Sequence, residues 1–203
     1  MIRLTPALLV ATANALCHVP NNMHAPASLV ELFVNGVMPQ PFDRWDAAFV
    51  HHAGFWSHYD NRTGTSSWPL PATAITNDLG LYAADQRVLS DEAPEPGELF
   101  LLWSPSQSAF VRTGIVVAVE PPVERYDGAL EYECNTIEAN VTGTGRLDGP
   151  GLGCGARLLC PTAGDRTIRW SDLEEHELTM RRLAAAGASG ATPERDVCRR
   201  EAA

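Results

Sequence analysis

The chain has 203 residues, 45% of them hydrophobic, so it can bury the core of one domain but is too short for two. Fifteen Lys and Arg against 25 Asp and Glu give a net charge of -10, which argues against nucleic-acid phosphates or anionic lipids as main partners. We therefore expect neither nucleic acid nor a membrane among the partners.

The N-terminus predicts a helix over residues 5–18. One positive charge, on Arg3, precedes a short and interrupted apolar stretch, which is how a secretory signal peptide also begins. No small-residue cleavage site follows, so we interpret the segment as a first amphipathic core helix. Because no clear signal peptide is present, the sequence favours the cytoplasm as the location. No apolar run is long enough to span a bilayer.

Three further helices are expected in the first half of the chain, over residues 27–36, from 43 or 46 to about 58, and 72–84. The first of these begins with Ser28 as its cap and Glu31 three positions later. Residues 61–71 are rich in Thr, Ser, Gly and Pro and predict a loop.

The second half predicts strands separated by Gly and Pro turns, over residues 98–103, 109–120, 131–138, 156–159 and 167–170. Helices followed by strands indicate an α+β fold with an antiparallel sheet. Residues 143–149 are interpreted as a hairpin loop. We expect one domain over residues 1–170, followed over 171–203 by a short helix (172–183) and a poorly ordered tail.

The cysteines are five in number and scattered, at Cys17, Cys134, Cys154, Cys160 and Cys198. Their spacing lacks the paired short intervals of zinc sites, and we expect neither a metal ion nor a cofactor. Cys154 and Cys160 are close enough to form a disulfide if the protein is exported, but a reduced state explains the count equally well.

Several short segments, in their order along the chain, resemble the CHAP family of cysteine, histidine-dependent amidohydrolases and peptidases. They are WDAAFV (45–50), EPGELF (95–100), RTGIV (112–116), TIEAN (136–140) and IRW (168–170). The first four are similar to that family's catalytic helix start, its P-G-D turn, its H-V-G-I-V strand and its T-I-E-G-N strand. The resemblance covers about residues 27–170. It implies a papain-like α+β fold and bacterial or phage cleavage of peptidoglycan, as an amidase or endopeptidase.

The reacting positions depart from this resemblance. Where the family has a cysteine thiolate and a histidine, this chain has Asp46 and Arg112; the pair implied to orient the histidine is present as Glu138 and Asn140. A carboxylate is a poor nucleophile for an amide, since attack would form an acyl anhydride. A guanidinium stays protonated and cannot accept a proton. The departure therefore casts more doubt on hydrolysis than on the fold.

Two readings of this charged pair stay open. Asp46 can be a helix cap that forms an ion pair with Arg112 in a site that has lost its activity, or both residues can line a cleft that binds a ligand. We expect a direct ion pair between the two, which Glu138 could join. The candidate binding residues are Trp45, Asp46, Arg112 and Trp68.

The aromatic residues Trp56, Trp68, Trp103 and Phe110 are most simply core or groove-lining side chains. Trp68 differs from the others because its Ser-Ser-Trp-Pro loop could expose the ring beside a cleft, as sugar rings and peptides require.

Replacement catalytic groups are hard to find in the sequence. Cys134 lies four residues before Glu138 on the same expected strand, about 13 Å away, and is expected to be a buried core thiol. His51 and His52 point to different faces of their helix. A metal site from Asp46 and these two histidines would lack the i, i+4 histidine pair of zinc-binding helices.

The sequence thus favours a degenerate, non-catalytic CHAP-like domain whose cleft binds peptide or cell-wall fragments. The alternatives are an active peptidoglycan amidase or endopeptidase with an unrecognised catalytic arrangement, and a structural domain whose partner is another protein.

Overall fold

The structure is a computed structural model that describes residues 6–17, 45–141, 147–169 and 179. The predicted helix 27–36 and almost all of the segment 171–203 lie outside these residues. No helix in the described ranges combines the length and the apolarity needed to cross a membrane.

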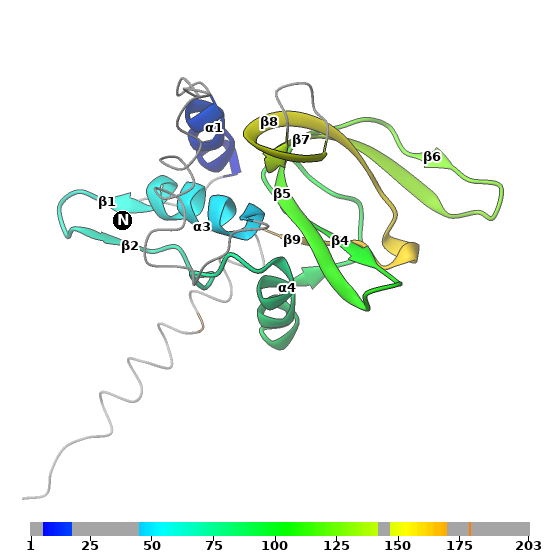
Figure 1. The fold of residues 1–203 in the computed structure, drawn as a ribbon, viewed down its shortest axis with the longest axis horizontal. Helices are drawn as coiled ribbons and strands as arrows, with labels where there is room; N and C mark the ends of the chain where they lie inside the picture. The colour runs from blue at the N-terminus through cyan, green and yellow to red at the C-terminus, as the bar shows by residue number, and fades with distance from the viewer. Residues whose placement is uncertain (1–5, 18–44, 142–146, 170–178, 180–203) are drawn as a thin grey trace, which may run out of the picture.

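Three α-helices occur in the described part of the chain: α1 (Pro6–Cys17), α3 (Asp46–Ser57) and α4 (Thr76–Asp85). They confirm the predicted helices, although α4 begins four residues later than expected. Helix α1 packs on α3, and α3 in turn packs against strands β5 and β7 of the sheet (Figure 1).

The sheet is antiparallel and curled, which confirms the predicted α+β class. Its strands are β3 (Leu89–Ser90), β4 (Leu99–Ser104), β5 (Ala109–Val119), β6 (Val123–Glu124), β7 (Leu130–Val141), β8 (Leu147–Leu159) and β9 (Arg166–Ile168). The order is β3-β9-β4-β5-β7-β6, and β8 pairs with β7. A separate hairpin, β1 (Tyr59–Asp60) with β2 (Thr65–Ser66), follows α3.

Strand β8 is the largest difference from the expected elements. It begins at Leu147, so the end of the predicted hairpin loop 143–149 belongs to the strand. Glycines at 149, 151, 153 and 155 give the segment no apolar alternation, and its pairing with β7 holds it extended. Strands β1, β2, β3 and β6 have two residues each, too few to carry a periodic signal.

Both faces of strand β4 are buried. Leu99 and Leu101 join the main core beneath α3, whereas Phe100 joins a second cluster on the opposite side of the strand, with Cys134 and Leu159. Burial on both faces explains why β4 is a continuous apolar run rather than an alternating one. One face of the sheet therefore packs against α3, and the other face covers the second apolar cluster.

Helix α3 carries a glycine where a tryptophan packs. Trp68 is buried, at 8% exposure, so the expectation that its loop exposes the ring is wrong. Its indole lies over Gly54, where a Cβ would come within 2.2 Å of the ring, and its ring centroid lies 5.2 Å from that of His58. Trp68 thus anchors the loop after β2 to the helix and belongs to the core.

This packing predicts the effect of a methyl group at position 54. At an exposed helical site Gly→Ala would stabilise by up to about 1 kcal/mol. Here we expect Gly54→Ala to lower the free energy of unfolding, measured by urea denaturation, by roughly 1–3 kcal/mol because the methyl group collides with Trp68.

The matched control is the same substitution in a Trp68→Ala background, where the collision is gone and Gly54→Ala should be neutral or stabilising. A stabilised Gly54→Ala single variant would contradict the packing.

Candidate functional site

Asp46 is the first residue of α3, and its carboxylate is fully buried. Trp45 occupies the N-cap position, so the interpretation of Asp46 as the cap is wrong, although a carboxylate in the first helical turn still benefits from the helix dipole. The Asp46 Oδ2 accepts hydrogen bonds from the Thr113 N–H and the Thr76 hydroxyl, each at 3.3 Å. One oxygen therefore links α3 to β5 and α4.

Arg112 lies on β5 and is 6% exposed. Its Nη1 donates to the carbonyl of Ala139 on β7, at 3.5 Å. Burial raises the pKa of Asp46, and the positive charge of Arg112 is among the influences that limit the rise. The two residues thus interact electrostatically, as the sequence led us to expect; a direct hydrogen bond between them stays a prediction.

Glu138 lies on β7, which pairs with β5, and its side chain is fully buried. Its carboxylate accepts from Arg157 of β8 and from the Thr136 hydroxyl, both at 2.5 Å. Gly114 of β5 leaves room for it, because a Cβ there would lie 2.8 Å from the Glu138 Cγ. Glu138 is therefore held by Arg157, a guanidinium that the sequence did not identify.

Arg157 could have been found only from the register of β8 on β7, which places it opposite Cys134 on the face that carries Glu138. Asn140 belongs to β7, but its side chain lies outside what the structure describes.

We call two charge pairs, Asp46 with Arg112 and Glu138 with Arg157, the charge cluster; the paired strands β5 and β7 carry Arg112 and Glu138. The carboxylates are fully buried, while the guanidinium side chains keep some exposure, 14% in Arg157. Trp45 is buried at 3% in the core below and does not face solvent as a binding residue would. The cluster is balanced in charge, and Arg157 is its most exposed member.

Among the described thiols, Cys134 shares strand β7 with Glu138 but is not an activated nucleophile. Cys134 is buried as expected, and burial, with a smaller effect from the charge of Glu98, raises its pKa to about 11, so the thiol stays protonated at neutral pH. Cys154 is exposed and Cys160 is buried, and both are free thiols, so the conceivable disulfide between them is not formed.

Three histidines of and next to α3 have pKa values lowered by burial. The pKa of His52 falls to about 4, with a second contribution from His51, and His51 and His58 shift in the same direction. His58 Nδ1 lies 2.6 Å from the Ser57 hydroxyl and 2.7 Å from the Gly54 carbonyl. Within the described ranges, no three His, Cys, Asp or Glu side chains gather to hold a metal ion.

Comparison with known proteins identifies no relative of this chain. No protein-family profile, no curated protein and no solved structure matches the chain. Its function is therefore inferred from residues and geometry.

Substitution of Asp46 tests the role of the buried carboxylate. Asp46→Ala leaves the Thr113 N–H, the Thr76 hydroxyl and the Arg112 charge without their acceptor, so we expect a loss of about 3 kcal/mol in unfolding free energy. Asp46→Asn keeps an acceptor oxygen and removes a charge that burial already disfavours, so its loss should be smaller. Equal losses in chemical denaturation would contradict this account.

The lowered pKa of His52 predicts a pH dependence. Between the unfolded value near 6.5 and the folded value near 4, the unfolded chain binds the proton that the folded chain does not, so His52 costs stability as the pH falls through this window. The raised pKa values of Asp46 and Glu98 act with the opposite sign, since these groups favour the folded state at acidic pH and lose that effect as the pH rises.

A comparison with His52→Gln isolates the histidine. Above pH 7 the unfolding free energies of the two proteins should differ by a constant amount that does not depend on pH, and on acidification the wild type should lose stability relative to the variant. Because the ring is partly exposed, we expect an effect of the order of 1 kcal/mol. Parallel stability curves from pH 7.5 down to about pH 4.5 would show that the His52 pKa is not lowered.

Proposed function

We propose that this chain is a non-catalytic CHAP-like domain of papain-like fold that binds peptide or cell-wall fragments. One observation carries the proposal. Asp46 at a helix start and Arg112 on a neighbouring strand, which stand where the resemblance has the reacting cysteine and histidine, interact in one buried cluster beside Glu138.

The chemistry of the cluster supports the absence of turnover. Arg112 remains a cation and cannot take a proton from a nucleophile or return one to a leaving amine. The Asp46 Oδ2 is already engaged in hydrogen bonds from Thr113 and Thr76, which connect α3 to β5 and α4. The buried thiol of Cys134 stays protonated, and amide cleavage by a thiol requires the thiolate.

The distribution of charge supports binding of a carboxylate-bearing peptide. Glu138 pairs with Arg157, Asp46 interacts electrostatically with Arg112, and the Arg157 side chain keeps 14% exposure. A guanidinium already oriented by one carboxylate offers its remaining N–H groups in a fixed geometry to a second. Stem peptides of cell walls end in carboxylates, so such fragments match this charge.

Cosedimentation with purified peptidoglycan sacculi tests the proposal. We expect the protein to pellet with the sacculi and to release no soluble fragments, and we expect Arg112→Gln to weaken binding at least about tenfold, equivalent to roughly 1.4 kcal/mol. Arg125→Gln is the matched control, because Arg125 pairs with Asp127 and Glu131 on the β6–β7 turn, away from the cluster.

Circular dichroism must show that both variants are folded. Failure of the wild type to pellet, or equal pelleting of the two variants, contradicts binding through the cluster. Release of fragments that Asp46→Ala abolishes would show that the chain is an active hydrolase instead.

A further inference from the structure

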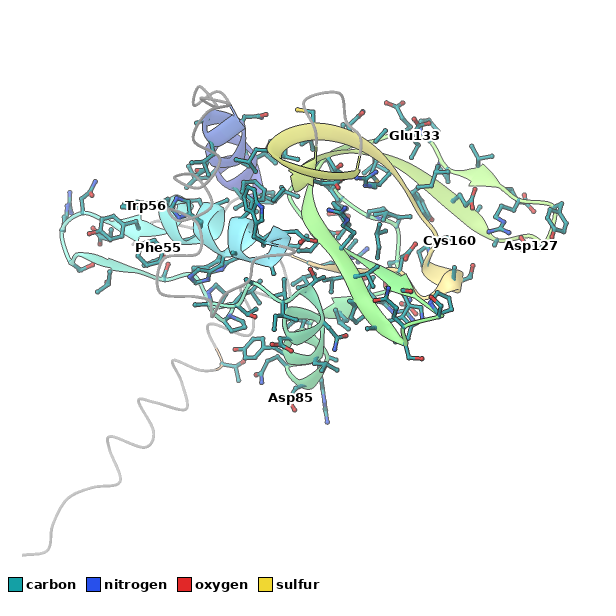
Figure 2. The ribbon with its side chains drawn as sticks, in the orientation of Figure 1. Phe55, Trp56, Asp85, Asp127, Glu133 and Cys160 are labelled. Carbon is teal, nitrogen blue, oxygen red and sulfur yellow. The ribbon has the colours of Figure 1, made fainter. Side chains whose placement is uncertain are left out.

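Of the two tryptophans Trp56 and Trp68, the exposed one is Trp56, near the C-terminal end of α3. Trp56 is 51% exposed, which corrects its interpretation as a core or groove-lining ring. Three rings flank it: Phe55 at 5.5 Å and 86°, Tyr59 at 5.0 Å and 54°, and His52 at 6.1 Å and 63°. These contacts limit the orientations open to the indole, and Figure 2 shows Phe55 and Trp56 at the base of the β1–β2 hairpin.

The surroundings of Trp56 are polar and almost uncharged. After Asp46 the helix has no Asp, Glu, Lys or Arg. The adjoining β1–β2 hairpin exposes the side chains of Asn61, Arg62, Thr63 and Thr65. The hairpin is tied to the helix end, because the Ser66 hydroxyl donates to the Phe55 carbonyl at 2.8 Å. A rigid aromatic surface thus lies beside a row of hydroxyl, amide and guanidinium groups.

We propose that the surface formed by His52, Phe55, Trp56 and Tyr59, called the aromatic surface below, binds a neutral glycan chain by stacking a sugar ring on the Trp56 indole. The apolar C–H face of a sugar packs on an aromatic face, while its rim of hydroxyls needs hydrogen-bonding partners, and the hairpin supplies these beside the ring.

The charge and the apolar area around Trp56 favour a neutral glycan over an anionic polymer or an apolar protein as the ligand. An anionic polymer would approach a chain of net charge -10 and find a surface flanked by one guanidinium, Arg62, and one carboxylate, Asp60. An apolar protein partner would need a broad apolar patch, yet in the described ranges the other large exposed apolar residues are on other elements. These are Ile75 and Leu81 at α4, Val123, Tyr126 and Leu130 on the β6–β7 hairpin, and Leu158 on β8.

The aromatic surface is separate from the charge cluster. Trp56 lies ten positions after Asp46 in the same helix, so the two backbone positions are about 15 Å apart at the α-helical rise of 1.5 Å per residue. The inference therefore does not depend on the cluster, and each site can be lost while the other is kept.

Titration of the protein with soluble cello- and chito-oligosaccharides, followed by tryptophan fluorescence and calorimetry, tests this inference. We expect saturable binding that Trp56→Ala weakens at least about tenfold, with Trp56→Phe retaining an intermediate affinity because it keeps an aromatic face. The control is Tyr126→Ala, which removes a 98% exposed ring from the β6–β7 turn and should bind as the wild type does.

Two results would overturn the inference: no saturable binding of either oligosaccharide, or equal affinities of the Trp56→Ala and Tyr126→Ala variants. Binding of an apolar dye lost in Trp56→Ala, without oligosaccharide binding, would assign the surface to an apolar partner and likewise overturn it. Oligosaccharide binding through Trp56 together with failure to pellet with sacculi would support the aromatic surface and reject the proposed function of the cluster.

Discussion

The carboxylate of Asp46 is the constraint around which the described fold is arranged. It is fully buried, and one of its oxygens accepts from the backbone of β5 and from a hydroxyl of α4. Removing a carboxylate from water is costly, and hydrogen bonds together with a nearby cation offset the cost. The start of α3 is consequently held in one position on the sheet, and the position of that helix determines which side chains meet β5 and β7.

Under the proposed function, this buried polar cluster serves position rather than reactivity. A nucleophile must be released from its hydrogen bonds to attack, and a general base must lose and regain a proton near neutral pH. Asp46 is held by its partners and Arg112 keeps its proton. Burial and charge pairing, which could tune a reactive pair, would here stabilise the junction between helix and sheet, and the partly exposed Arg157 would be the group most available to a ligand.

Much of the architecture could be predicted from the sequence because it follows from patterns local to each segment. The start of α3 and the strands β4, β5 and β7 were predicted within a few residues, as was the meeting of Asp46 with β5. The exposure of the two tryptophans could not be predicted, because it depends on which residue the loop after β2 covers. Gly54 admits Trp68 into the core, and Trp56 is left outside. Arg157 was missed for a related reason, since its contact with Glu138 depends on the register of a glycine-rich strand.

The electrostatic coupling between Asp46 and Arg112 also bears on how this pair of positions can change during evolution. A single replacement at either position leaves the opposite charge buried with less compensation, so we expect the stability effects of the two replacements not to add. The two sites are epistatic, and the lineage can leave the charged state only by a paired change or after stabilising substitutions elsewhere. A chain in this state is therefore held there by its folding stability, whether or not selection still acts on a ligand.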